Sequence, residues 1–216
     1  MISIREAEQI IKAHIPQSMP ETKPLRDSLG YFLAQDIMAP EPLPHFDNSA
    51  MDGFAVALPD SDKEETMTEF PIIGESRAGL PFDGALKFGT AVRISTGAMV
   101  PENTDLVVPI ENTEVKDQQV RVVDMGSRGA HIRRKGEEVD TGDILVKRSS
   151  LITPPVLSWL GTFGVVVVPV YRKPDVAILT TGQELVDATQ EIKPGQIRNS
   201  NQLYLETFVE SLHLKV

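Results

Sequence analysis

Three prolines at alternate positions, Pro40, Pro42 and Pro44, constrain the fold of this chain more than any other feature. Each proline lacks a backbone donor and disfavours helix at the residue before it, so this stretch must be extended and free of helix. Helical periodicity precedes the prolines, and short β-type runs follow them. We therefore predict a domain boundary near residue 45.

The segment before the prolines is predicted to be helical and then extended. Ser3 and Glu6 have the spacing of a capping box. Apolar residues recur behind this cap at helical spacing, at Ile4, Ala7, Ile10 and Ile11. A second short helix is expected over Leu25–Gly30. Farther along the chain, Thr153 and Pro154 indicate the start of a helix that Gly161 closes.

Between Met51 and about Gly142 the pattern changes to short β-type runs separated by Gly, Pro and Asp turns. Their spacing favours a small β-barrel or sandwich over parallel βαβ units. Ser61–Thr66 is interpreted as a solvated acidic loop. The predicted strands are Phe54–Ala57, Phe70–Ile73, Thr90–Ile94, Leu106–Ile110 and Val120–Val123.

The last forty residues, after a second boundary at Arg172–Pro174, have the pattern of an α/β domain. Val176–Leu179 is a continuous apolar run, which is typical of a buried parallel strand. Ser200–Leu214 is expected to form a helix. One strand and one helix cannot cover both faces of a parallel sheet, so we expect the chain to stop inside a domain. The helix residues expected to point inward are Tyr204, Phe208, Val209 and Leu212.

Composition excludes several classes of protein. The chain has no cysteine, which removes disulfides, thiolate metal sites and thiol catalysis. A net charge of −10 predicts that the protein binds neither nucleic acid nor anionic membranes. No apolar run is long enough for a membrane helix, and no secretory signal is visible, so we predict a cytoplasmic protein.

One basic cluster stands out against this acidic background. Arg133, Arg134 and Lys135 follow Arg128 and His131 within eight residues. Such a cluster could hold a small anion. The alternative is a solvated hairpin tip.

Two loops in the predicted β region carry polar groups suited to chemistry. In Asp47–Gly53, two carboxylates, an amide and a hydroxyl precede a strand, so Asp47 or Asp52 could face a metal ion or a reacting oxyanion. The alternative is an ordinary polar turn. Farther along, Ser95, Thr96 and Gly97 follow a β-run and could bind an anion through hydroxyls and backbone N–H groups. By itself this pattern is usually only a loop.

A third candidate lies in the α/β segment. Gly182 and Glu184 follow the predicted strand, at the edge where open α/β sheets place their ligands. A helix that begins near Asn199 or Ser200 would offer free N–H groups to a phosphate. No standard nucleotide motif supports this site. The four histidines, at positions 14, 45, 131 and 213, do not have metal-ligand spacing.

Together these segments resemble the MoeA/gephyrin E-domain family of molybdopterin molybdenumtransferases, in its N-terminal part. Asp47–Gly53 is the most specific match. The resemblance implies a multidomain α+β fold. A helical and linker domain of residues 1–45 and 143–173 is interrupted by a β-barrel-like domain of residues 46–142, and residues 174–216 begin an α/β, molybdopterin-binding domain. The matching segments, in family order, are Phe46–Ala55, Ile94–Pro101, Arg133–Glu138, Thr181–Leu185 and Gly195–Asn201.

The resemblance also implies a function. Family members insert molybdate into adenylylated molybdopterin with Mg²⁺ and release AMP. They are cytoplasmic homodimers that work with other cofactor-synthesis proteins, and their active site lies between the β domain of one subunit and the α/β domain of the other. By motif position Asp52, Thr96 and Glu184 correspond to catalytic residues, and Asp52 and Glu184 suit Mg²⁺. The implied substrate-binding residues are Ser95, Gly97, Arg133, Arg134, Lys135, Gly182, Asn199, Ser200 and Asn201.

The chain differs from the family in its length, because it is shorter than a full member. A full member continues through the rest of the α/β domain and a C-terminal β domain. We therefore expect this 216-residue chain to be an incomplete and inactive piece of such an enzyme. The alternative from another functional class is a non-catalytic module that dimerises or serves as a scaffold for cofactor-synthesis proteins.

Overall fold

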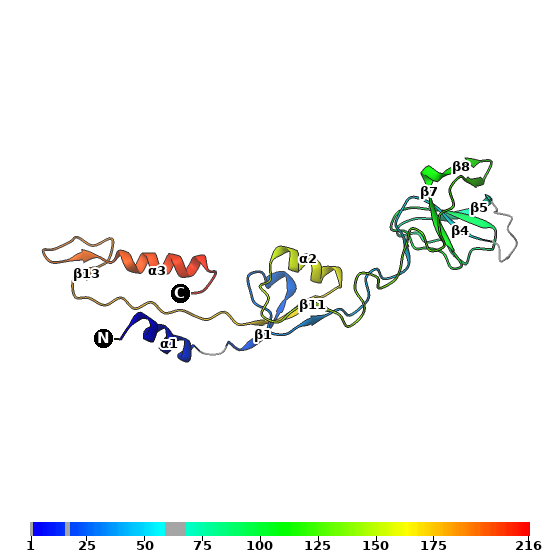
Figure 1. The fold of residues 1–216 in the computed structure, drawn as a ribbon. Coiled ribbons are helices and arrows are strands. Elements are labelled where there is room, and N and C mark those ends of the chain that lie inside the picture. Colours follow the sequence, from blue (N-terminus) through cyan, green and yellow to red (C-terminus); the bar gives the residue numbers. More distant parts are fainter. Residues whose placement is uncertain (1, 16–17, 59–67) are drawn as a thin grey trace. The chain divides into compact units, whose positions relative to one another are not determined.

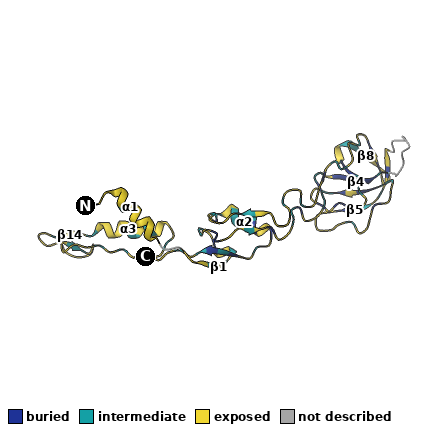
Figure 2. Ribbon diagram, turned by 60° about the horizontal axis from the view of Figure 1, so that its bottom comes forward, coloured by how far each residue is buried: buried dark blue, intermediate teal, exposed yellow. Residues whose placement is uncertain are grey.

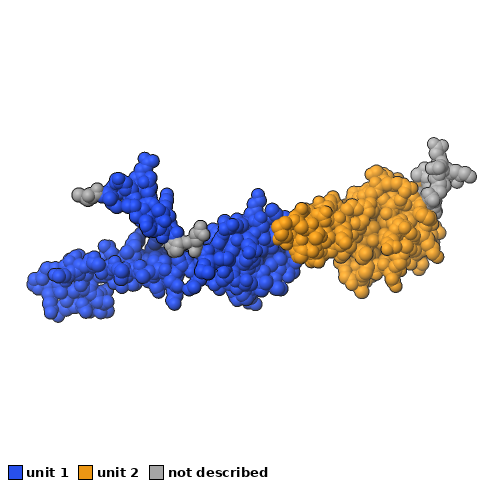
Figure 3. All heavy atoms as spheres, turned by 90° about the horizontal axis from the view of Figure 1, so that it is seen from below, with its two compact units in different colours: residues 1–37, 144–216 blue, residues 38–143 orange. Residues whose placement is uncertain are grey.

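The computed structural model describes residues 2–15, 18–58 and 68–216 (Figure 1). The chain divides into two compact units (Figure 3). Unit 1 consists of Met1–Ile37 and Ile144–Val216, and unit 2 consists of Met38–Asp143. The acidic loop expected at Ser61–Thr66 lies outside the described residues. The three-domain division, with boundaries at 45, 142 and 173, stays a prediction.

A curled half-barrel sheet of six strands forms most of unit 2. Its strand order is β7-β4-β6-β5-β9-β8, so β7 and β8 are the edge strands. All neighbouring strands are antiparallel except β5 and β6, which are parallel. Each of the five predicted β-runs overlaps one of these strands, but the expected barrel-like domain is not confirmed. The strands are β4 (Gly53–Ala57), β5 (Glu69–Ser76), β6 (Thr90–Ile94), β7 (Leu106–Pro109), β8 (Thr113–Lys116) and β9 (Gln119–Val122), and the short helix η2 (Ile110–Asn112) precedes β8.

Buried apolar side chains lie on both faces of the central strands of this sheet (Figure 2). Successive side chains of a strand point to opposite faces, and β4 is buried along its whole length. Phe54 and Val56 belong to one cluster, with Phe70 and Val120, whereas Ala55 belongs to another. The central strands are therefore packed on both faces, which explains why their apolar runs could be recognised in the sequence.

A short ladder and a hydrogen-bonded stem organise the rest of unit 2. β3 (Asn48–Ser49) pairs in antiparallel fashion with β10 (Ile132–Arg133). In the stem, Ala39 N–H donates to the carbonyl oxygen of Asp143 at 2.8 Å, and Gly142 N–H donates to that of Ala39 at 2.9 Å. The two ends of unit 2 are therefore bonded to each other. The strand β11 (Ile144–Val146), which belongs to unit 1, forms a further two-stranded sheet with β2 (Ile37–Met38).

Unit 1 begins with α1 (Ile4–His14), whose predicted capping box is confirmed, because Ser3 and Glu6 bond each other's backbone N–H groups. β1 (Pro20–Pro24) pairs with β12 (Val167–Tyr171), and α2 (Pro154–Thr162) confirms the helix predicted after Thr153. These elements make the part predicted as helical a mixture of helix and sheet. The core of this part contains Leu33, Ile152, Leu160, Val168 and Val170.

The prediction of a second helix over Leu25–Gly30 is wrong. Only η1 (Leu25–Asp27), a single 3-10 turn, forms there. Ser28 Oγ donates to the Leu25 carbonyl oxygen at 2.7 Å, a local bond that competes with helix propagation. Gly30 then adopts a φ of 74° and donates its N–H to Ile152, which ends the turn.

The prediction of a buried parallel strand at Val176–Leu179 is also wrong. None of these residues lies in a strand, and the Leu179 side chain is 89% exposed. The pairing forms farther along, between β13 (Leu185–Val186) and β14 (Ile197–Arg198), which are parallel. An apolar run becomes a buried strand only where neighbouring strands and helices cover it.

The expected C-terminal helix forms as α3 (Ser200–Ser211). Its apolar side chains do not point into a core as expected, since Tyr204, Phe208 and Leu212 are each at least half exposed. None of the helices in the described part of the chain has the length and apolar character needed to cross a bilayer.

Candidate active site

Asp52 and Thr96 meet at one end of the half-barrel sheet. Gly53, the first residue of β4, is opposite Ile94, the last residue of β6. Asp52 and the Ser95–Gly97 loop therefore emerge side by side. Asp52 Oδ1 accepts hydrogen bonds from Thr96 N–H at 2.7 Å and from Thr96 Oγ1 at 3.1 Å. Both residues are exposed, and the other carboxylate oxygen, Oδ2, has no hydrogen-bond partner among the described residues.

The short strand β3 fixes the Thr96 loop from its other side. Gly97 N–H donates to Ser49 O at 2.8 Å, and Ser49 N–H donates to Ala98 O at 3.0 Å. Gly97 has a φ of 77°, in the left-handed region that favours glycine. Ser49 is fully buried, and its hydroxyl donates to Met51 O at 2.6 Å. The loop around Thr96 is therefore held in one conformation by the Asp47–Gly53 motif.

The same motif also holds the basic turn. Asp47 Oδ2 accepts a hydrogen bond from Arg134 Nη1 at 2.7 Å, and Asp47 Oδ1 accepts one from Lys135 N–H at 2.8 Å. Arg134 N–H donates to Glu137 Oε2 at 2.8 Å. Arg134 is therefore neutralised in part by Asp47. The side chains of Arg133 and Lys135 are exposed and form no ion pair with another described residue.

Asp47 is held in its charged form by these contacts. Burial raises the pKa of Asp47, but the Lys135 N–H and the Arg134 guanidinium outweigh it and keep the pKa below the ordinary value of 3.8. A carboxylate with a lowered pKa stabilises the fold above its ordinary pKa, and that stabilisation is lost as the pH falls through the lowered value. The effect on stability is small because the Asp47 side chain is 36% exposed.

We therefore predict that the Lys135 amide proton reports the titration of Asp47. Its NMR chemical shift should change with a midpoint below pH 3.8, because Asp47 Oδ1 is its acceptor. In the Asp47→Asn variant this inflection should disappear. A midpoint at or above 3.8 in the native chain would contradict the assignment.

The remaining predicted residues lie in unit 1, around the start of α3. Asn199 caps this helix, since its Oδ1 accepts from Gln202 N–H at 3.2 Å and its Nδ2 donates to Thr180 Oγ1 at 2.8 Å. A cavity of about 280 Å³ opens here. The α3 N–H groups and Arg198 make it suited to an anion. Its lining residues are Thr180, Thr181, Leu185, Ile197, Arg198, Asn199, Ser200, Asn201 and Leu205.

Glu184 lies over the Gly182 backbone. A Cβ at Gly182 would be 2.6 Å from Glu184 Oε1, and Gly182 has a φ of 154°. The Glu184 carboxylate could move aside, but the positive φ favours glycine at position 182. The hydrogen bond from Leu185 N–H to Gly182 O, at 3.2 Å, closes this turn and directs the chain into β13.

The structure groups the predicted residues by unit. Unit 2 brings together Asp52, Ser95, Thr96, Gly97, Arg133, Arg134 and Lys135, whereas unit 1 holds Gly182, Glu184, Asn199, Ser200 and Asn201. No cluster of three or more acidic or histidine side chains that could hold a metal occurs among the described residues. Mg²⁺ ordinarily keeps several waters and takes only one or two carboxylates. The exposed Asp52 carboxylate, with Oδ2 unbonded, fits such a ligand.

Two structural roles in this site were not predicted. Ser49 stabilises the Thr96 loop through its backbone, and Glu137 stabilises the basic turn. The signal for Ser49 was its place in the specific Asp47–Gly53 motif, where a small buried side chain fits between two loops. For Glu137 the signal was its spacing of three residues from Arg134.

Comparisons with known proteins agree with the resemblance found in the sequence. Residues 2–164 match the family described as "MoeA N-terminal region (domain I and II)". The molybdopterin molybdenumtransferase of Haemophilus influenzae is 35% identical over the whole chain, which covers 53% of that protein. That of Staphylococcus aureus is 37% identical, and the chain covers 52% of it. The chain thus spans about half the length of these relatives.

Solved structures lead to the same family. The molybdopterin biosynthesis moeA protein from Pyrococcus horikoshii matches the whole chain with a TM-score of 0.85 and 30% identity, and the match covers 56% of that protein. A second structure of this protein matches with a TM-score of 0.86 and 28% identity, over 58% of its length. The resemblance to the molybdopterin molybdenumtransferases is thereby confirmed. The chain belongs to the MoeA family, of which it carries the N-terminal region.

Proposed function

We propose that this chain supplies part of the active site of a cytoplasmic transferase of molybdenum cofactor biosynthesis. The reaction is the Mg²⁺-dependent insertion of molybdate into adenylylated molybdopterin, with release of AMP. The relatives named molybdopterin molybdenumtransferase support the reaction class. The observation that carries the proposal is the Asp52 carboxylate, held by both the N–H and the hydroxyl of Thr96 at the end of the sheet.

The proposed roles follow from the hydrogen bonds. Thr96 uses both of its donors to fix Asp52 Oδ1, so Oδ2 is directed away from that contact and is available to a ligand. Because the β3 strand holds the loop, the carboxylate needs little reorganisation when the substrates bind. Asp52, Thr96 and Glu184 are the proposed catalytic residues.

Anion binding is proposed for the basic turn and for the start of α3. The substrates carry phosphate and molybdate groups, whereas the chain has a net charge of −10, so local positive charge is required. Arg133 and Lys135 have exposed cationic groups, and Asp47 holds the Arg134 guanidinium. Ser95 and Gly97 belong to the anion-binding loop. In unit 1, the proposed substrate-binding residues are Gly182, Asn199, Ser200 and Asn201, three of which line the cavity at α3.

Mg²⁺ is the proposed cofactor, with Asp52 and Glu184 as its carboxylate ligands. When bound, this ion supplies positive charge that offsets the charge of the phosphate groups. The chain's own contribution is to keep the Asp52 carboxylate oriented, which Thr96 does through two hydrogen bonds to Oδ1.

The proposal is tested with a hybrid protein that joins this chain to the C-terminal half of the Staphylococcus aureus relative. We expect the hybrid to form molybdenum cofactor from adenylylated molybdopterin, molybdate and Mg²⁺. The 216-residue chain alone should be inactive, because it spans about half the length of the relatives. AMP release and cofactor formation are measured together. Activity of the chain alone would contradict its proposed role as a partial site.

We also propose a homodimer, supported by α1. Its isoleucines are exposed, with Ile4 at 83% and Ile11 at 62%, and they lie seven residues apart on one side of the helix. A second copy of the chain would cover this apolar side. A non-catalytic scaffold would also use such exposed surfaces, as would contacts with other cofactor-synthesis proteins. The Asp52–Thr96 pair favours the enzyme over the scaffold.

Sedimentation equilibrium tests the homodimer. The native chain is expected to sediment as a dimer, and Ile11→Glu should shift it to monomer because a charge would be buried in the interface. Gln9→Glu, a change to an exposed residue on the opposite side of α1, serves as the control and should leave the dimer intact. Equal effects of the two substitutions would exclude α1 from the interface.

A further inference from the structure

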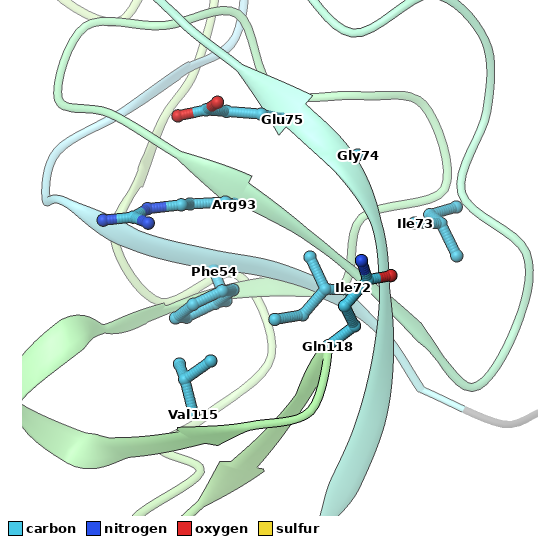
Figure 4. Close-up of a pocket in the computed structure, with 8 residues that line it drawn as sticks. All are labelled: Phe54, Ile72, Ile73, Gly74, Glu75, Arg93, Val115 and Gln118. Carbon is cyan, nitrogen blue, oxygen red and sulfur yellow. The ribbon is translucent and has the colours of Figure 1, made fainter.

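A second cavity, of about 470 Å³, lies on the half-barrel sheet of unit 2 (Figure 4). None of its residues belongs to the proposed active site. We propose that this cavity binds a small monocarboxylate that carries an aromatic or branched apolar group. The proposal is independent of the proposed function. The lining residues are Phe54, Ile72, Ile73, Gly74, Glu75, Arg93, Val115 and Gln118.

The apolar part of the cavity is formed by three strands. Phe54 of β4 is 1% exposed and packs within one core cluster of the sheet, and Ile72 of β5 packs against that cluster. Val115 of the edge strand β8 is 57% exposed. In Figure 4 the Phe54 ring, Ile72 and Val115 lie together below Arg93. A cavity of this size and lining suits a small ligand with an apolar group.

Arg93 supplies a positive charge above this apolar surface. It is directly opposite Phe54 in the antiparallel β4–β6 ladder, so the two side chains share one face of the sheet. Arg93 is exposed and forms no ion pair or hydrogen bond with any other described residue. A guanidinium binds a carboxylate through two parallel hydrogen bonds. Arg93 is therefore the proposed anchor for the ligand's carboxylate.

An irregularity in β5 places Glu75 beside Arg93. The β5–β6 register shifts between Ile72 and Gly74, and beyond the shift Glu75 is opposite Arg93. Such a bulge turns a side chain toward the other face of a sheet. In Figure 4 the Glu75 carboxylate and the Arg93 guanidinium project to the same side. Glu75 is paired with Arg77 at 2.6 Å, which leaves Arg93 for a ligand.

Glu75 also limits the charge of the ligand. Arg93 and Arg77 together carry two positive charges and Glu75 carries one negative charge, so these three groups have a net charge of +1. A ligand with one negative charge balances them, whereas a phosphate dianion leaves one charge unbalanced and is repelled more strongly by the Glu75 carboxylate. The cavity therefore favours a monoanion.

The Asp117–Gln118 turn gives the cavity a polar end. Both residues have positive φ, 49° and 62°, in the two-residue connection between β8 and β9. Such turns favour glycine, so a glutamine is kept there at a conformational cost. Its side chain lines the cavity and can bond a polar group of the ligand.

The test is an NMR titration of the full chain with phenylacetate and with its uncharged analogue, phenylacetamide. The matched variants are Arg93→Gln and Arg121→Gln. Arg121 is an exposed β9 arginine outside the cavity, so its replacement makes the same change of charge elsewhere. The signals followed are the side-chain amide of Gln118 and the backbone amides of Phe54 and Arg93.

We expect phenylacetate to shift these signals and to bind at least about tenfold more tightly than phenylacetamide. Arg93→Gln should weaken phenylacetate binding by about the same factor, and Arg121→Gln should leave it unchanged. The proposal is overturned if phenylacetamide binds as tightly as phenylacetate to the native chain. It is equally overturned if Arg93→Gln and Arg121→Gln have equal effects, or if phenyl phosphate binds more tightly than phenylacetate.

Discussion

Replacing Asp52 by asparagine in the hybrid protein is expected to lower cofactor formation by about 100-fold or more. Asparagine keeps the size of the side chain and can still accept the two hydrogen bonds from Thr96. It removes the negative charge and one carboxylate oxygen. The fold should therefore persist while the proposed ligand to Mg²⁺ is lost.

The matched control for this prediction is Asp83→Asn. Asp83 is an exposed aspartate of the same unit and is not one of the proposed site residues. Both variants should keep the thermal midpoint of the native hybrid, and only Asp52→Asn should lose activity. If Asp52→Asn and Asp83→Asn have equal activity, Asp52 is not part of the catalytic machinery.

The largest expected effect on stability is that of Gly53→Ala. A Cβ at this position would be 1.9 Å from the carbonyl oxygen of Val108, in the neighbouring strand β7. Backbone cannot move aside as a flexible side chain can, so β4 and β7 would have to separate. We expect a loss of about 3 kcal/mol or more in the free energy of unfolding, measured by urea denaturation.

Gly161→Ala is the control for this substitution. Gly161 lies inside α2, and a Cβ there has no neighbour within 4 Å. Alanine is the better helix former, so this change is expected to add about 0.5–1 kcal/mol. Equal destabilisation by the two substitutions would mean that the packing of Gly53 against β7 is not the cause.

The β strands and the main site motif were predictable because their signals are local. Thr90–Ile94 is a short, mostly apolar run bounded by turn residues, and Asp47–Gly53 is specific enough to identify the family. The pairing of Asp52 with Thr96 could not be predicted from the residues alone. It depends on the register of β4 against β6, which the sequence does not display.

The wrong predictions arose where structure depends on distant partners. Val176–Leu179 has the composition of a buried strand, but composition does not determine which strands pair with it. A helix was expected over Leu25–Gly30, yet the bond from Ser28 and the hydrogen bond of Gly30 to Ile152 favour a turn. The contact of Arg134 with Asp47 was not predicted, because only the fold brings these two residues together.

The hydrogen-bonded stem of unit 2 has a consequence for the order of folding during synthesis. β1 cannot form its sheet until its partner β12 has been synthesised, much later in the chain. If residues 38–143 fold first, the bonds between Ala39 and Asp143 join the ends of that long insertion. The open chain between β1 and β12 then becomes roughly fourfold shorter, which lowers the entropic cost of bringing them together by about 1 kcal/mol. Folding of the half-barrel thus favours the pairing of β1 with β12, the two strands that flank it in the sequence.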